Sequence, residues 1–164
     1  MQRHEHGGPL PAPLRAWAAT LPDLAGDVVT DADLSEPYLH LSAPATPSQL
    51  APIRDRVLEW TYAVRLLEDE RQDIVMATDE AVSNAVRHAY HHESGMVTVF
   101  AACDRLARAV HVVVSDDGTW SAPSGTGNGG RGLEMMDALS DVFDLHHDAR
   151  GTTVVLRWAR RANA

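Results

Sequence analysis

The chain has few cysteines, few aromatic residues and no long apolar run. Cys103 is the only cysteine among its 164 residues, so no disulfide can form within the chain, which fits a reducing compartment. Aromatic residues make up 5% of the sequence and hydrophobic residues 45%, so aliphatic side chains must fill most of the core. The longest apolar segments are strand-sized, whereas a membrane helix needs ~20 apolar residues. We therefore expect a cytoplasmic protein without membrane attachment.

Basic residues are also scarce, with 14 Lys and Arg against 23 Asp and Glu and a net charge of −9. Contact with a nucleic-acid backbone needs a basic face that replaces counterions, so direct nucleic-acid binding is not expected. A basic protein partner is compatible with this charge. The first residues, Met-Gln-Arg-His-Glu-His, lead into no apolar run, so a secretory signal is not expected. The nine histidines lack metal-ligand spacing and are interpreted as surface residues.

The chain divides into an N-terminal extension and one domain. Residues 1–36 are rich in Pro, Ala, Gly and Asp; we expect a loosely attached extension of unknown role. Residues 37–160 form the predicted domain. Its pattern predicts, in order, a strand, two helices, two strands, a long loop, a helix and a final hairpin. This order predicts an α+β fold, a two-layer sandwich in which helices cover one face of a mixed β-sheet.

The segment 79–90 is predicted to be a helix with a polar stripe. Glu80, Asn84 and His88 stand four residues apart, so they line up on one side of the helix. Such groups beside an apolar seam are costly unless each has a partner. A metal ion and a polyphosphate would supply partners: Asn84 offers a neutral oxygen suited to Mg²⁺, Glu80 could accept a proton, and Arg87 could reach a phosphate. The alternative is an ordinary solvated helix face.

Three further motifs contain glycine. Asp116 and Gly118 follow a valine-rich strand, where a carboxylate could accept hydrogen bonds from an exocyclic amine; the alternative is an Asp-Gly turn. Residues 129–133 end the long loop and open a helix, so their backbone N–H groups could face an anion; the alternative is a hinge. Thr152, after a glycine, could bind a base or a water; the alternative is an ordinary strand start.

In this order and spacing, the four motifs resemble those of the Bergerat ATP-binding fold, the GHKL ATPase fold that histidine kinases share. The resemblance covers about residues 40–158: 80–90 resembles its N box, 116–118 its first glycine box, 130–133 its second, and 151–152 its late threonine position. Within that fold, Asp-Glu-Ala-Val-Ser-Asn-Ala-Val-Arg-His-Ala-Tyr and the helix after Gly-Arg-Gly-Leu resemble bacterial anti-sigma-factor serine/threonine kinases of the partner-switching type.

The resemblance implies a role for each motif. Glu80 would be the catalytic base, Asn84 would bind Mg²⁺, and Asp116 would bind the adenine amine with help from Thr152. The loop 119–129 would form a lid over ATP. The residues that the resemblance assigns to ATP binding are Asn84, Arg87, Asp116, Gly118, Gly130, Arg131, Gly132, Leu133 and Thr152.

The resemblance also implies a function. The protein would use ATP and Mg²⁺ to phosphorylate Ser or Thr on an anti-anti-sigma partner with a STAS domain, and it would sequester a sigma factor; a homodimer is compatible with this function. One position departs from the family pattern, because Trp120 stands where the first glycine box usually has its second glycine. The alternative function is therefore a catalytically weak nucleotide-binding regulatory module that acts through protein contacts.

Overall fold

The computed structural model describes residues 9–90, 95–105, 108–118 and 129–161. Its centre is a five-stranded sheet with the order β1-β2-β3-β5-β4. Every pair of neighbouring strands is antiparallel, so the expectation of a mixed sheet is wrong. The reason lies partly in the short β2–β3 and β4–β5 connections, since hairpins join antiparallel strands. The strands are β1 (Leu39–Pro44), β2 (Met96–Cys103), β3 (Ala109–Asp116), β4 (Val142–Asp148) and β5 (Gly151–Ala159).

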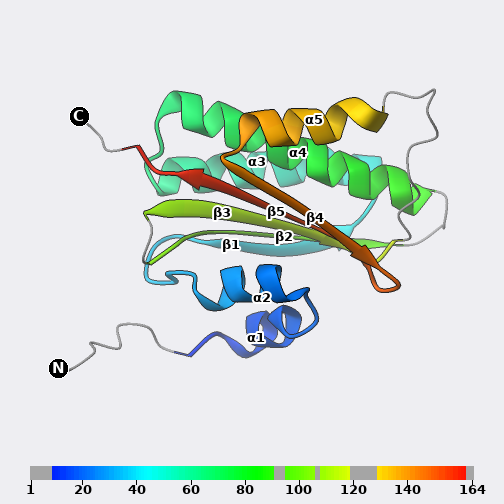
Figure 1. The fold of residues 1–164 in the computed structure, drawn as a ribbon, viewed down its shortest axis with the longest axis horizontal. Helices are drawn as coiled ribbons and strands as arrows, with labels where there is room; N and C mark the ends of the chain where they lie inside the picture. Colours follow the sequence, from blue (N-terminus) through cyan, green and yellow to red (C-terminus); the bar gives the residue numbers. More distant parts are fainter. Residues whose placement is uncertain (1–8, 91–94, 106–107, 119–128, 162–164) are drawn as a thin grey trace.

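Three helices, α3 (Leu50–Ala63), α4 (Glu68–Tyr90) and α5 (Gly129–Leu139), cover one face of the sheet (Figure 1). A short 3-10 turn, η1 (Pro47–Gln49), precedes α3. The main core lies between these helices and the sheet, where Ile74 and Val82 of α4 and Val112 of β3 are almost completely buried. The predicted α+β class is confirmed. Of the helices that the structure describes, none has the length and apolar character needed to cross a membrane.

The N-terminal extension covers the second face of the sheet (Figure 1). Its two helices, α1 (Ala12–Ala18) and α2 (Asp23–Thr30), pack against side chains that point away from α4. The Trp17 ring centroid lies 5.1 Å from that of His40 and 6.1 Å from that of Phe100. The buried residues of this second core are Leu14, Ala18, Ala25, Val29, Ala32, Phe100, Ala102, Val113 and Val155.

The second core corrects two expectations, a loosely attached extension and helices on one face only. The physical reason is that β2 and β3 also carry apolar residues on their second face, where Phe100, Ala102 and Val113 are buried against the extension. The helical pattern in the extension is too short for its packing to be predicted from periodicity alone.

Truncating Leu14 should show that the extension belongs to the folded unit. Leu14 is 2% exposed, whereas Leu24 in the same extension is 48% exposed. We expect Leu14→Ala to lower the free energy of unfolding by about 2–5 kcal/mol through the cavity it leaves, and Leu24→Ala to have a much smaller effect. Urea unfolding of the whole chain measures both. Equal, small losses in the two variants would mean that the extension contributes little to stability.

Candidate nucleotide-binding and catalytic site

The polar stripe lies on the helix that the spacing predicts. The first turn of α4 is acidic, which favours a helix start because carboxylates interact well with the N-terminal end of the helix dipole. Glu80 and Asn84 are half-buried on one side of α4, while Ala81 and Ala85 are buried on the neighbouring side. The structure therefore places the two predicted key residues one turn apart on the same helix face.

Arg87 joins these two residues. Its Nη2 donates to Glu80 Oε1 at 2.8 Å and to Asn84 Oδ1 at 2.6 Å, and its Nε donates to the Ser83 carbonyl at 3.3 Å. The Glu80 side chain is 21% exposed and that of Arg87 is 49% exposed. The i,i+3 and i,i+7 spacings make these contacts possible, although the sequence alone suggests only a phosphate contact for Arg87.

The second glycine motif lies next to Glu80. A Cβ atom at Gly132 would lie 2.3 Å from Glu80 Oε1, so the carboxylate occupies the space that any other residue would fill. Gly130 and Arg131 belong to the first turn of α5, which begins at Gly129. Leu133 is half-buried against the main core. The first-turn N–H groups of a helix have no intrahelical acceptors, so this turn can receive an anion beside Glu80.

Asp116 is the last residue of β3 and pairs in register with Thr152 of β5. Its Oδ1 accepts a hydrogen bond from Gly118 N at 2.9 Å. Thr152 is 4% exposed, and its Oγ1 has no hydrogen-bond partner in the part of the chain that the structure describes. A carboxylate and a buried hydroxyl that lacks a partner thus lie together at this end of the sheet, where a ligand with donors and acceptors would satisfy both.

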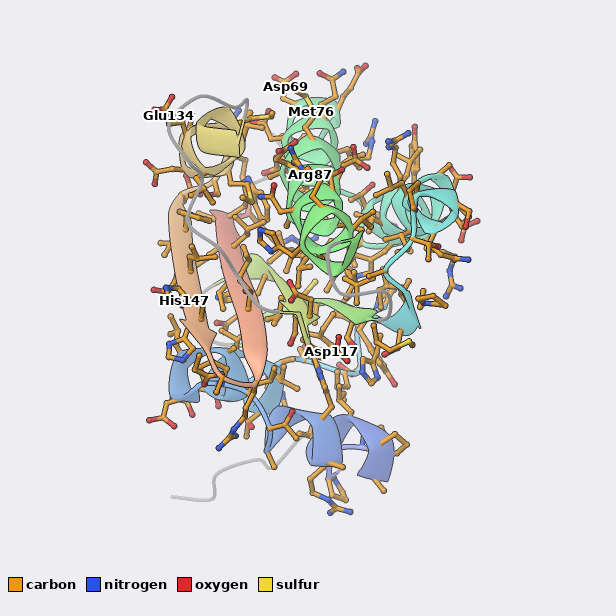
Figure 2. All side chains as sticks on the ribbon, turned by 90° about the vertical axis from the view of Figure 1, so that its right-hand side faces the viewer. Asp69, Met76, Arg87, Asp117, Glu134 and His147 are labelled. Carbon is orange, nitrogen blue, oxygen red and sulfur yellow. The ribbon has the colours of Figure 1, made fainter. Side chains whose placement is uncertain are left out.

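The strand end and the helix stripe lie at one end of the molecule. Figure 2 views this end and shows Arg87 on α4 above Asp117, which follows Asp116 at the end of β3. The structure therefore brings the predicted residues of α4, β3, β5 and α5 to the same end. Residues 119–128, including Trp120 and most of the predicted lid, lie outside the described residues, so the predictions made for them stay predictions.

Burial raises the pKa of Asp116 to about 6 from its ordinary value of 3.8; the backbone N–H groups of Gly118 and Thr152 partly offset this rise, and Asp117 adds to it. The folded protein then binds more protons than the unfolded chain between about pH 4 and 6, so stability falls as the pH rises through this range. We expect a loss of about 1–3 kcal/mol, since one pKa unit corresponds to about 1.4 kcal/mol and the carboxyl is partly solvated.

The Asp116→Asn variant should lack this loss and be more stable than wild type at pH 7. Urea unfolding between pH 4 and 7 measures it, with Asp137→Asn as control, because Asp137 is an exposed carboxylate on α5. Parallel pH profiles for wild type and Asp116→Asn would contradict the raised pKa of Asp116.

The combination of a polar helix stripe, a strand-end carboxylate and a glycine-opened helix defines an ATPase domain of the histidine-kinase type. The chain belongs to the family of histidine kinase-like ATPase domains, whose sequence model matches residues 43–158. It is 29% identical over 138 residues to the serine-protein kinase RsbW of Bacillus subtilis (strain 168), covering 73% of this chain and 83% of that protein. It is 24% identical over 102 residues to the anti-sigma F factor of Clostridium acetobutylicum, covering 54% and 70%.

A solved structure supports the same relationship. The crystal structure of the RsbU and RsbW domains of a Mycobacterium tuberculosis protein matches with a TM-score of 0.64 and 31% sequence identity. The match covers 78% of this chain and 34% of that longer chain. These comparisons confirm the predicted resemblance to anti-sigma serine kinases.

Proposed function

We propose that this protein is an ATP-dependent serine/threonine kinase that phosphorylates an anti-anti-sigma partner with a STAS domain and sequesters a sigma factor. The main observation behind the proposal is that Gly132 of α5 lies next to Glu80 of α4. The second glycine motif therefore lies beside the helix stripe that contains Asn84. Relatives named serine-protein kinase and anti-sigma factor support this function.

The residues at the site fit ATP and Mg²⁺. Asn84 Oδ1 is a hard, neutral oxygen of the kind that Mg²⁺ accepts alongside phosphate oxygens. The first turn of α5 contains Gly130, Arg131 and Gly132, and its backbone N–H groups would favour an anionic phosphate. Thr152 Oγ1 is a buried hydroxyl without a partner among the described residues. When bound, Mg²⁺ would neutralise the charge that develops on the phosphates.

The side chains of the chain itself would then position the two reactants. The Asp116 carboxylate would accept a hydrogen bond from the adenine amine, with Thr152 and Gly118 beside it, which favours adenine over guanine because guanine has a carbonyl at that position. Glu80 would accept the proton of the partner's Ser or Thr hydroxyl as its oxygen bonds the γ-phosphorus. The bond to the β-phosphate oxygen breaks, and ADP leaves. Most of the rate would come from positioning and from charge stabilisation.

A reconstituted transfer reaction tests the proposal. The whole chain is incubated with its STAS partner, Mg²⁺ and γ-labelled ATP, and label on the partner's Ser or Thr is measured. Wild type should transfer label, and Asn84→Ala should lose both transfer and Mg²⁺-dependent ATP binding. Gln72→Ala is the control, because Gln72 is an exposed residue of α4 two turns from Glu80. If the wild-type protein binds ATP tightly but transfers no label, the kinase activity is contradicted. That result would favour the alternative function, a nucleotide-binding regulatory module that acts through protein contacts.

A further inference from the structure

Arg87 occupies the oxygens on which the proposed chemistry depends. Its guanidinium Nη2 lies 2.6 Å from Asn84 Oδ1, the proposed Mg²⁺ ligand, and 2.8 Å from Glu80 Oε1, on the proposed proton acceptor. One cationic nitrogen thus bridges both functional groups of the helix stripe. While this contact persists, the guanidinium lies where the hydroxyl of an incoming partner would have to approach Glu80 Oε1.

A guanidinium and Mg²⁺ cannot share Asn84 Oδ1 in this geometry. Mg²⁺ binds oxygen at about 2.0–2.1 Å and demands near-octahedral order, so the metal would stand next to the Arg87 guanidinium, with like charges in contact. Two cations at such short range repel strongly wherever the dielectric constant is below that of water. Binding of Mg²⁺ at Asn84 Oδ1 and the contact of the Arg87 guanidinium with the same oxygen therefore disfavour each other.

Arg87 is the group that can leave. Its side chain is 49% exposed, and its remaining contact, from Nε to the Ser83 carbonyl, is long at 3.3 Å. Exposed ion pairs contribute little to stability, so a change of rotamer into solvent or toward a phosphate costs little. Glu80, in contrast, is 21% exposed, so its side chain is more enclosed than that of Arg87.

We propose that Arg87 is an internal stand-in for the metal: it holds Glu80 and Asn84 in position and keeps Glu80 ion-paired until Mg²⁺ arrives with the nucleotide and displaces it. The inference rests on the proposed function and adds a regulation of the same site. Arg87 is then a positioning residue whose departure, triggered by the metal, frees the base. Transfer would be suppressed whenever nucleotide is bound without the metal.

The state of the Arg87 guanidinium can be followed by arginine-side-chain ¹⁵N NMR, with its signal assigned by its loss in Arg87→Met. In free protein we expect a signal shifted by the Glu80 and Asn84 contacts; Mg²⁺ with ADP should abolish that shift, and ADP in EDTA should not. Arg54 is the matched control, because it forms a two-bond pair with Asp79 at 3.0 and 3.1 Å one residue from Glu80. Its signal should stay unchanged.

A second measurement uses the Mg²⁺ concentration at which ADP binding is half-maximal. Without a competing cation, Arg87→Met should need about two- to fivefold less Mg²⁺ than wild type; Arg87→Lys should lie between the two, because lysine keeps the charge but not the planar fork. An unchanged or higher Mg²⁺ requirement in Arg87→Met, or an Arg87 signal released by ADP alone, would overturn the proposal.

A thermal-shift measurement with ADP and Mg²⁺ separates this failure from that of the proposed function. If nucleotide and Mg²⁺ stabilise the protein while Arg87 stays paired to Glu80, only the proposed role of Arg87 as a metal stand-in is rejected. No stabilisation by any nucleotide would reject the proposed function, and the metal stand-in with it.

Discussion

Replacing Glu80 with glutamine should reduce phosphoryl transfer to the STAS partner by about 10²–10⁴-fold, the range that loss of a general base produces. Glutamine has nearly the shape of glutamate and still offers an oxygen to Arg87, but it cannot take the proton of the attacking hydroxyl. Binding of Mg²⁺ and ATP should stay close to wild type, because Asn84, Asp116 and the first turn of α5 are unchanged. Single-turnover transfer and calorimetric binding measure the two effects separately.

Glu134→Gln is the matched control for this prediction. Glu134 is an exposed carboxylate on α5, and Figure 2 shows it on the side of α5 that faces away from α4. It should transfer phosphate at the wild-type rate. If Glu80→Gln transfers phosphate at the wild-type rate, Glu80 is not the general base. If ATP binding and transfer fall by the same factor, Glu80 acts in binding and not in catalysis.

The helix stripe could be predicted because its geometry is local. Residues four apart on a helix share a face whatever the rest of the fold does, so Glu80 and Asn84 needed no tertiary information. The meeting of Gly132 with Glu80 is different, because it depends on how α5 packs on α4. Only the resemblance to a known fold, carried by motif order, implied that the glycine motif belonged to the same site.

The two neighbouring aspartates at the end of β3 differ in ways that the sequence alone does not predict. Asp116 and Asp117 are chemically alike, yet strand alternation separates them. Asp116 follows Val112 and Val114 on the helix-covered face, whereas Asp117 Oδ1 accepts a hydrogen bond from Met96 N at 2.9 Å and fixes the start of β2. The resemblance selected Asp116, but the raised pKa of Asp116 depends on burial that no local pattern reports.

The role of Gly151 likewise became visible only in the structure. In the sequence it is only the glycine that precedes Thr152. In the fold its φ is +143°, and a Cβ atom there would lie 1.9 Å from the Asp116 carbonyl oxygen. At Gly151, the backbone of the β4–β5 hairpin is therefore in close contact with the end of β3, where Asp116 is the proposed adenine contact.

Gly151→Ala should destabilise the fold strongly, with a loss of about 3 kcal/mol or more in the free energy of unfolding. A backbone at this φ strains any residue with a side chain, and the clash is with backbone atoms of β3, which cannot rotate away. Gly26→Ala is the control: its Cβ would meet only the Ala18 carbonyl oxygen, at 3.2 Å, and alanine favours the helix. Urea unfolding should separate the variants clearly, and equal stabilities would mean that the hairpin moves away from Asp116 without cost.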